Sequence, residues 1–470
     1  MVSGTLGVFA ELDSPIAWRS FETPTLERAE ADGRLLFLVI GVSWCPYSQR
    51  LLRRLAHDVE TQAVLHESYL PILVDGDDHP AIHTRYSGGG WPSIAICTSD
   101  GLPIWRGTQV DPGGFPRLLR TLADRPALAT PATSPIELDA PSPDAAANQI
   151  LRAVRDAYDP ASRGFALEPE AAGPRFPHFD AIELLLEIGT DGDTTMALDA
   201  LRQIMDRLWH RADGGLRRYA TAPNWSDVHG EKLLVDQASL IATLAAARVQ
   251  DPECGELASA VLEWTIEQFR QTDGAFAAGL RPAHVEVPPA WPVPALDTSI
   301  LIDWNARLAS ALLLLAEATA DREQHDRAVE LVRSLLAHVA DGHVPHRVRG
   351  GVARAGTLAD LTYLAVAAFD AGMGEVSRGL VDRALADRRL PDGSLSDIPL
   401  DDTAPGLLRR PIAPLRENAV FAELCARLGG GYWETGREIL EAVSGSAIRG
   451  GIMASRYAVA QLRTAGLDSD

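Results

Sequence analysis

One short stretch of the chain, Gly41 to Leu52, carries a cysteine where redox enzymes place a nucleophile. It reads GVSWCPYSQRLL, and its thiol, Cys45, follows the apolar run RLLFLVIG and precedes an amphipathic segment. The pattern predicts a strand-to-helix turn, where backbone N–H groups and the helix dipole stabilise a thiolate. The position three residues later, where a second cysteine would complete a Cys-x-x-Cys pair, is Ser48. A single thiol still forms a mixed disulfide, but it cannot release its partner by internal exchange.

Two interpretations of Cys45 stay open. Trp44 beside it favours a surviving surface for a thiol or disulfide partner, whereas Ser48 favours a degenerate site without turnover. Cys97 is a poor substitute for the missing thiol, because it lies five residues beyond Pro92 on the same predicted strand, roughly 16 Å away. We expect a monothiol site that is weak or inactive in dithiol turnover, with Cys45 at least partly exposed. The four cysteines are spaced singly, which favours a reducing cytoplasm.

The elements around Cys45 alternate between strand and helix patterns. RLLFLVIG, LPILVDGDD, WPSIAICTSDG and LPIWRG read as strands, and SQRLLRRLAHDVETQAVLHESY, HPAIHTRYSG and FPRLLRTLADR read as helices. The order βαβαββα predicts an α/β thioredoxin-like domain over residues 1–125. In such folds a cis proline faces the active cysteine, so we expect Trp91-Pro92 to be cis and to face Cys45.

A different pattern follows a Pro-rich segment, residues 126–143, that reads as a linker. Residues 144–470 show twelve helical segments and a recurring mark between them: RGF, DGG, DGA, DGH, DGS and RGG, at intervals of 50 to 68 residues. Repeated units of two helices predict an all-α (α/α)6 toroid of six helical hairpins, with an open solenoid as the alternative. The loops with the mark are long and the others short, so the long loops should share one face.

The predicted long-loop face gathers polar and aromatic side chains that suit a small-molecule pocket. The candidates for contact with a small polyol- or sugar-like ligand are Arg175, Arg217, Tyr219, Glu231, Asp236, Asp297, Trp304 and Asn305, beside Trp44 and Trp91 of the first domain. Asp297 and Asp303 with Trp304 and Asn305 suggest a polar floor with an aromatic platform, although a tryptophan in such a helix is more often core.

Three residues near the start of one predicted inner helix, His229, Lys232 and Asp236, are spaced to share a helix face. His229 would then act as general base and Lys232 would polarise an oxygen. The alternative is a structural Lys232–Asp236 ion pair. Lys232 is the only lysine of the chain, which suggests that this position requires a point charge.

His178 opens another helix and is the candidate for a second acid or base facing His229, by analogy with toroid sugar epimerases. The alternative is a histidine bonded to a backbone carbonyl. The helix face that carries Asp180, Glu183 and Glu187 reads as solvated. We find no carboxylate pair typical of a glycoside hydrolase, no metal motif and no phosphate-binding loop, and we predict no cofactor.

The chain resembles the spermatogenesis-associated protein 20-like family in many short motifs that occur in the family's order. They include SPIAWRSFETPTLERAEADGRLLFLVIGVSWCPYS, ILVDGDDHPAIHTRY, GGGWPSIAICTSDGLPI, GGLRRYA, NWSDVHGEKLLVDQASL and LDTSILIDWNARLASAL. The resemblance implies a thioredoxin-like domain joined to a six-hairpin glycosidase-like toroid, and it implies little about the reaction. Two departures are Ser48 in place of the family's second cysteine, and Gly230 within a motif that is otherwise His-Phe-Glu-Lys.

The overall charge of the chain excludes some classes of binding partner. The net charge of −21 argues against nucleic acid or an anionic membrane, and no apolar run is long enough to span a bilayer. We also see no signal peptide at the start of the sequence. The sequence therefore predicts a monothiol thioredoxin-like protein whose toroid binds a polyol- or sugar-like ligand. The alternatives are a sugar-modifying enzyme of the epimerase or isomerase kind, and a non-catalytic binding or scaffold protein.

Overall fold

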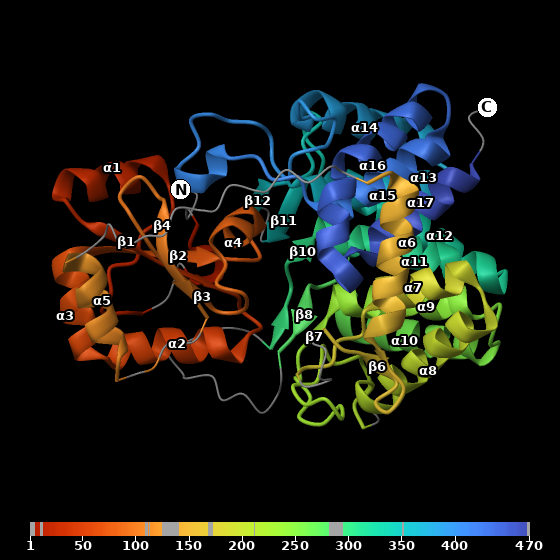
Figure 1. Ribbon diagram of the computed structural model, residues 1–470, viewed down its shortest axis with the longest axis horizontal. Helices are drawn as coiled ribbons and strands as arrows, with labels where there is room; N and C mark the ends of the chain where they lie inside the picture. The colour runs from red at the N-terminus through yellow and green to blue at the C-terminus, as the bar shows by residue number, and fades with distance from the viewer. Residues whose placement is uncertain are drawn as a thin grey trace. The chain divides into compact units, whose positions relative to one another are not determined.

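The structure is a computed structural model (Figure 1). It describes residues 5–9, 13–108, 111, 113–124, 141–167, 173–210, 212–281, 295–349 and 352–467. The chain forms two compact units. The first contains Met1–Ile136, Arg281–Asp297 and Leu400–Pro411, and the second contains Glu137–Leu280, Thr298–Pro399 and Ile412–Asp470. Most of the predicted linker, residues 125–140, lies outside the described residues.

A four-stranded sheet forms the centre of the first unit, in the order β2-β1-β3-β4. β1 (Leu35–Gly41) pairs in parallel with β2 (Tyr69–Asp75) and antiparallel with β3 (Ser93–Cys97), which pairs antiparallel with β4 (Pro103–Gly107). β1 and β2 are apolar along nearly their whole length because both faces of the sheet are buried. Alternate residues of the two strands belong to two separate apolar clusters, one on each face. The predicted thioredoxin-like order is confirmed.

The helices of the first unit are α1 (Thr23–Asp32), α2 (Pro46–His57), α3 (Val59–Ser68), α4 (Pro80–Tyr86) and α5 (Phe115–Asp124), with a short 3-10 helix η1 (Gly7–Phe9). The sequence predicted one helix where the structure has α2 and α3. The break lies at Asp58, whose side chain accepts a hydrogen bond from the Thr61 N–H and so caps α3.

A late segment of the chain completes the first unit. The 3-10 helix η3 (Gly406–Arg409) belongs to it, although the sequence assigned this segment to the toroid. The Arg85 guanidinium donates to the carbonyl oxygens of Leu407 and Arg410, and the Leu407 N–H donates to the Tyr86 hydroxyl. The strand β9 (Leu296–Asp297) lies in the first unit as well.

The described part of the second unit holds twelve α-helices in two concentric sets. The inner helices are α7 (Phe179–Ile188), α9 (Leu234–Ala247), α11 (Ile302–Thr319), α13 (Leu358–Asp370), α15 (Leu415–Leu428) and α17 (Ser455–Gly466). The outer helices are α6 (Pro143–Ala157), α8 (Asp191–Arg207), α10 (Glu253–Phe269), α12 (Arg322–Leu336), α14 (Gly374–Arg388) and α16 (Gly431–Gly450), which runs into the 3-10 helix η4 (Gly451–Ala454).

The inner helices form a closed ring. Each packs against the next, and α17 packs against α7, while the first helix, α6, packs against α17 (Figure 1). The predicted (α/α)6 toroid is therefore confirmed, and the open solenoid is excluded. Short strands connect the helices: β5 (Tyr158–Asp159), β6 (Gly164–Phe165), β7 (Lys232–Leu233), β8 (Gly279–Leu280), β10 (Ile300–Leu301), β11 (Pro345–Arg349) and β12 (Val352–Ala355).

The recurring Asp-Gly mark is a turn that an amide side chain of an inner helix holds in place. The residue three positions after the Asp makes two hydrogen bonds of 2.8–3.0 Å to one side-chain amide. Its backbone N–H donates to the amide oxygen, and its backbone C=O accepts from the amide NH2. The pairs are Gln237 with Leu216, Asn305 with Phe276, and Asn418 with Leu395. The glycine of the mark has a positive φ in each case, which explains its recurrence.

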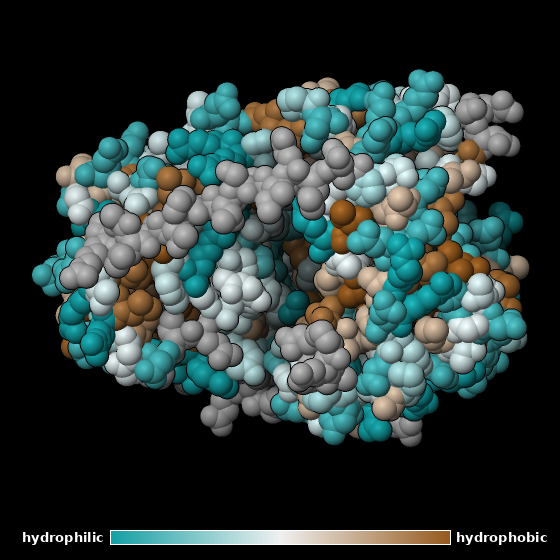
Figure 2. Space-filling model, viewed as in Figure 1, coloured by the Kyte–Doolittle hydropathy of each residue, from teal (hydrophilic) through white to brown (hydrophobic). Residues whose placement is uncertain are grey.

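The surface agrees with the acidic, polar composition. Hydrophilic side chains are spread over both units in the space-filling view, with smaller apolar patches between them (Figure 2). Among the described residues, no helix has the length and apolar character that crossing a membrane requires.

Candidate functional site

A cavity of about 1330 Å3 lies inside the ring of inner helices. The inward faces of all six inner helices line it. The lining includes residues of first helical turns, such as Asp180 and Arg456, and residues of last turns, such as Asp370 and Gly466. The cavity therefore follows the length of the ring instead of lying only at the face of long loops. Pockets of several hundred cubic ångströms accommodate small organic ligands, so the volume is ample for one.

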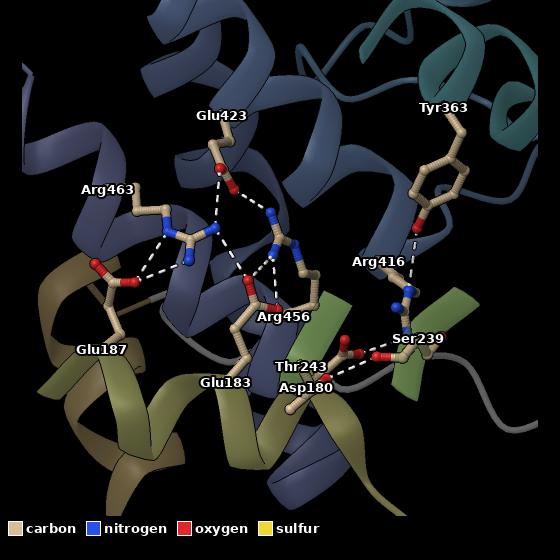
Figure 3. Close-up of polar contacts among 10 residues, drawn as sticks. All are labelled: Asp180, Glu183, Glu187, Ser239, Thr243, Tyr363, Arg416, Glu423, Arg456 and Arg463. Carbon is tan, nitrogen blue, oxygen red and sulfur yellow. Dashed lines mark hydrogen bonds and ion pairs between the residues drawn. The ribbon is translucent and has the colours of Figure 1, made fainter. Parts of the chain in front are cut away.

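One wall of the cavity is a network of carboxylates and guanidinium groups from α7, α15 and α17 (Figure 3). Arg456 contacts both Glu183, at 2.9 Å, and Glu423. Arg463 contacts the same two carboxylates at 3.0 and 3.3 Å and also Glu187 at 2.8 Å. Each of these charged groups has an opposite partner on a neighbouring inner helix, and three carboxylates face two guanidinium groups, which leaves a small net negative charge.

A second ionic contact extends this wall. Arg416 Nη1 donates to Asp180, and Arg416 Nε donates to the Tyr363 hydroxyl at 3.1 Å (Figure 3). The lining from α9 and α11 mixes small apolar residues with polar and charged ones, among them Ala242, Ala311, Ser239, Thr243 and Arg307. The cavity thus offers an ionic wall on α7, α15 and α17, and small apolar and polar side chains on α9 and α11.

Glu183 of the network is ionised. Burial alone would raise the pKa of Glu183, but the charges of Arg456, Arg463 and Arg416 hold that pKa below its usual value. The prediction that Asp180, Glu183 and Glu187 lie on a solvated face holds for Glu187, which is exposed, whereas Asp180 and Glu183 are half-buried; all three line the cavity. An ionised, paired carboxylate does not serve as the proton donor that glycoside hydrolysis requires.

None of the toroid residues selected from the sequence lines this cavity. The two histidines do not face each other. His178 contacts Phe176, which stacks on Tyr219 at 4.5 Å, and Tyr219 stacks on His229 at 4.2 Å. Two aromatic rings therefore lie between His178 and His229. Tyr219 is a member of this stack in the loops before α9.

His178 is a strained, neutral residue. It precedes α7 with a φ of 48°, and its Nε2 is buried without a hydrogen-bond partner. Burial lowers its pKa to about 4, opposed by Asp180 and assisted by Arg175. The alternative of a bond from Nε2 to a backbone carbonyl is not realised. His229 instead lies 3.3 Å from Glu231, a buried residue.

The predicted helix face of His229, Lys232 and Asp236 is wrong, since α9 begins only at Leu234 and Lys232 lies in β7. Lys232 Nζ contacts Asp213 at 2.9 Å, donates to the Gly214 carbonyl and lies 5.1 Å from the centre of the Trp264 ring. The Lys232–Asp236 ion pair is therefore wrong too. Burial, with a smaller effect of Arg217, lowers the pKa of Lys232 to about 8.

The buried carboxyl of Asp236 is a different case. Burial raises its pKa to about 6, and its Oδ2 has no hydrogen-bond partner.

The two predicted ligand-binding arginines lie in the loops. Arg175 is buried, and it donates to Ser162 and Asp159 of the preceding turn. Arg217 lies in the loop after the DGG mark, where burial lowers its pKa. Arg175 thus holds a loop in place and does not reach into the cavity.

The proposed floor of Asp297, Trp304 and Asn305 is not assembled. Asn305 is fully buried and holds the turn at Phe276, as described above. Trp304 is half-buried on α11. Asp297 belongs to the first unit, where its Oδ2 accepts a hydrogen bond from the Ser43 hydroxyl at 3.0 Å. Ser43 lies two residues before Cys45 in the sequence.

Cys45 lies at the N-cap of α2, as predicted, but the expectation that it is partly exposed is wrong, because only 4% of it is exposed. Its Sγ lies 3.9 Å from the carbonyl oxygen of Trp91, and the Trp91-Pro92 bond is cis, as expected. Ser48 is fully buried, and its Oγ accepts a hydrogen bond from the Val42 N–H at 3.3 Å.

Aromatic side chains surround the thiol. Trp44 contacts Trp91 edge to face, with 6.2 Å between ring centres, and donates from its indole N–H to Asp77 at 3.0 Å. Trp91 stacks on His83 at 3.8 Å. Gly76 is needed beneath it, because a Cβ there would lie 2.3 Å from the Trp91 ring.

Comparisons with known proteins address the two units separately. Residues 8–124 match the thioredoxin-like family Thioredox_DsbH, described as a protein of unknown function, DUF255. Spermatogenesis-associated protein 20 of Mus musculus is 25% identical over 301 residues, which is 56% of this chain and 38% of that protein. The predicted family resemblance is confirmed. Uncharacterized protein B0495.5 of Caenorhabditis elegans is 25% identical over 264 residues, 49% of this chain and 36% of that protein. The match thus spans less than two fifths of these relatives.

Solved structures share the toroid fold of this chain. The cellobiose 2-epimerase of Spirochaeta thermophila has a TM-score of 0.52 at 14% identity, over 70% of this chain and 98% of that one. A D-mannose isomerase has a TM-score of 0.51 at 12% identity, over 64% of this chain and 85% of that one. At these identities the likeness establishes the fold alone.

Proposed function

We propose that the toroid binds a small, uncharged, polyhydroxylated molecule, a polyol or sugar, in the cavity inside its inner ring. The observation that carries the proposal is the ionic wall around Arg456 and Arg463. A hydroxyl group both donates and accepts a hydrogen bond, so a row of hydroxyls suits a wall of fixed carboxylate acceptors and guanidinium donors. The carboxylates of the wall outnumber its guanidinium groups by one, which disfavours an anionic ligand.

The small side chains of α9 and α11 support the same ligand class. Ala242 and Ala311 leave space beside the ionic wall, and C–H groups on one face of a sugar pack on such small side chains. Because Glu183 is held ionised by its arginine partners, binding without hydrolysis is the role that we propose.

A sugar-modifying enzyme of the epimerase or isomerase kind is the second candidate. The observation that favours it is His178, a buried imidazole that stays neutral at neutral pH and has no partner on Nε2. Such a group is able to accept a proton. The separation of His178 from His229 by two rings argues against a mechanism with two facing histidines.

For the first unit we propose a monothiol role with weak or no dithiol turnover. Ser48 lacks the thiol that would release a mixed disulfide, and the burial of Cys45 restricts access to its sulfur. The proposed location is the cytoplasm, as the singly spaced cysteines predicted.

A thermal-shift screen tests the ligand class. Monosaccharides, disaccharides, polyols, and sugar acids as charged analogues would be added to the full chain, since a ligand that binds only the folded state raises the melting temperature. We expect uncharged polyhydroxylated compounds to raise it and sugar acids to have less effect. A response confined to charged compounds would contradict the proposal.

A further inference from the structure

Three buried side chains outside the cavity form a compact cluster at the start of two neighbouring inner helices. They are Asp303, in the first turn of α11, His346 in β11, and Asp360 in the first turn of α13. One possible ligand atom of each lies within 4.8 Å of those of the other two. The three residues are far apart in the sequence, which explains why no metal motif was visible there.

Asp360 is fixed by several hydrogen bonds. His346 Nδ1 lies 3.0 Å from both of its carboxylate oxygens. Its Oδ2 also accepts from the N–H and hydroxyl of Thr357, which caps α13, and its Oδ1 accepts from the Asp303 N–H at 3.3 Å. The capping box explains why an aspartate stands at position 360, but it does not explain the second carboxylate of the cluster.

Asp303 is that second carboxylate, and it is only 5% exposed. Its Oδ1 has no hydrogen-bond partner, and its Oδ2 lies 3.9 Å from Arg307 Nη2, beyond hydrogen-bond distance. Glu417 adds a further negative charge nearby. An oxygen buried beside a second carboxylate without a partner is unfavourable unless something else binds it.

We infer that Asp303, His346 and Asp360 bind a divalent first-row transition-metal ion, such as Mn2+ or Zn2+. Two carboxylates and one imidazole are a mixed oxygen and nitrogen donor set that such ions accept. Ligands about 2.1 Å from one ion lie roughly 3.4 Å from each other, so ligand atoms within 4.8 Å of one another need to approach by at most about 1.4 Å. A histidine nitrogen that binds a metal ion gives up its proton, so binding should release protons.

The position of the cluster indicates what a bound ion would do in the fold. Arg307, one helical turn after Asp303, and Tyr363, one turn after Asp360, both line the cavity, and Arg307 stacks 3.8 Å from the Tyr363 ring. A bound ion links α11, α13 and β11, and so fixes the start of two neighbouring inner helices.

Metal titration of the full chain tests the inference. MnCl2 and ZnCl2 would be titrated by calorimetry and thermal shift, and CoCl2 would be followed by its visible absorption in the unsubstituted chain. We expect one ion per chain, a raised melting temperature, and a Co2+ spectrum that differs from that of the aqueous ion. Absence of binding by all three ions at concentrations up to about 1 mM would overturn the inference, because a specific buried site binds its ion more tightly than that.

Variants locate the ion. Asp303→Asn should fold, because the lost charge makes no hydrogen bond, and should weaken binding by about 100-fold or more. Glu330→Gln removes a charge from an exposed residue of the outer helix α12 that is not part of the cavity lining, and it should bind as the unsubstituted chain does. His210→Gln tests the exposed His210–Asp213 pair, the obvious surface alternative. Unchanged affinity in Asp303→Asn, or loss of binding in His210→Gln alone, would overturn the assignment. If Asp303→Asn fails to fold, the same comparison with His346→Gln decides.

Discussion

Arg456 of the last inner helix lies with its Nη1 2.9 Å from Glu183 Oε1 of the first inner helix. The contact spans 273 residues of sequence and closes the ring where α17 meets α7. The same guanidinium contacts Glu423 of α15, so one arginine connects three inner helices (Figure 3). The charges that line the cavity therefore also hold the toroid together.

Replacing Arg456 by methionine should lower the free energy of unfolding by roughly 2–4 kcal/mol, because two buried carboxylates lose a partner. Methionine keeps most of the apolar length of the side chain, so the loss is electrostatic. Urea unfolding measures it. The matched control is Arg378→Met, which breaks an exposed pair with Glu375 and should change stability by less than about 0.5 kcal/mol. Equal effects of the two substitutions would contradict this role of Arg456.

A pH-dependent loss of stability should come from His178. Its pKa is about 4 in the folded chain, against 6.5 ordinarily, because burial disfavours its charge. The unfolded chain therefore takes up a proton as the pH falls below 6.5, and the folded chain does not until about pH 4. Stability from this residue is complete above pH 6.5 and is lost between pH 6.5 and 4, by about 1–3 kcal/mol.

The His178→Asn variant separates this effect from general acid unfolding. Asparagine tolerates the φ of 48° at this position, and it does not titrate. Urea unfolding at pH 7 and pH 4.5 should show a smaller difference for His178→Asn than for the unsubstituted chain. The exposed His325 provides the control, since His325→Asn should leave the difference unchanged. An equal pH difference in all three proteins would rule out His178 as the source.

Ser48→Cys should form a disulfide with Cys45 under mild oxidation. The two positions are the N-cap and the third residue of α2, a spacing that suits a Cys-x-x-Cys pair, and a thiol is similar in size to the buried hydroxyl. Loss of two titratable thiols measures the reaction. Cys97, fully buried on β3, should stay reduced, and burial raises its pKa. A variant that keeps both thiols free would mean that the turn no longer has redox geometry.

Lys232→Met should lower stability by about 1 kcal/mol and leave sugar binding unchanged. The methionine keeps the packing on Trp264 but loses the contacts with Asp213 and the Gly214 carbonyl. Chemical unfolding and ligand titration of the same variant measure the two effects. Weakened ligand binding at unchanged stability would return Lys232 to the binding site.

The sequence predicted elements better than it predicted contacts. The apolar runs around Cys45 and the repeated Asp-Gly mark depend on neighbours close in the chain, and both folds followed from them. His229 and Lys232 were placed on a helix because periodicity does not reveal that the chain stays extended as far as Leu233. Boundaries of this kind depend on pairing with a distant strand, here β8.

The cavity wall was missed for a related reason. Arg456 and Arg463 are seven residues apart on α17, and Glu183 and Glu187 are four apart on α7. Both spacings place the two side chains on one face of a helix, and this was the available signal in the sequence. Charged residues at helical spacing usually face solvent, so the pattern was interpreted as an exposed face. Only closure of the ring turns these faces toward each other.

Titration of the best sugar or polyol from the screen into cavity variants tests the central claim most directly. Ala242→Leu fills space inside the inner ring, whereas Ala260→Leu adds the same atoms to an exposed position on the outer helix α10. Calorimetry should show affinity reduced about tenfold or more for Ala242→Leu, and affinity like that of the unsubstituted chain for Ala260→Leu. Equal affinity in all three proteins would place the ligand elsewhere and contradict the proposed cavity site.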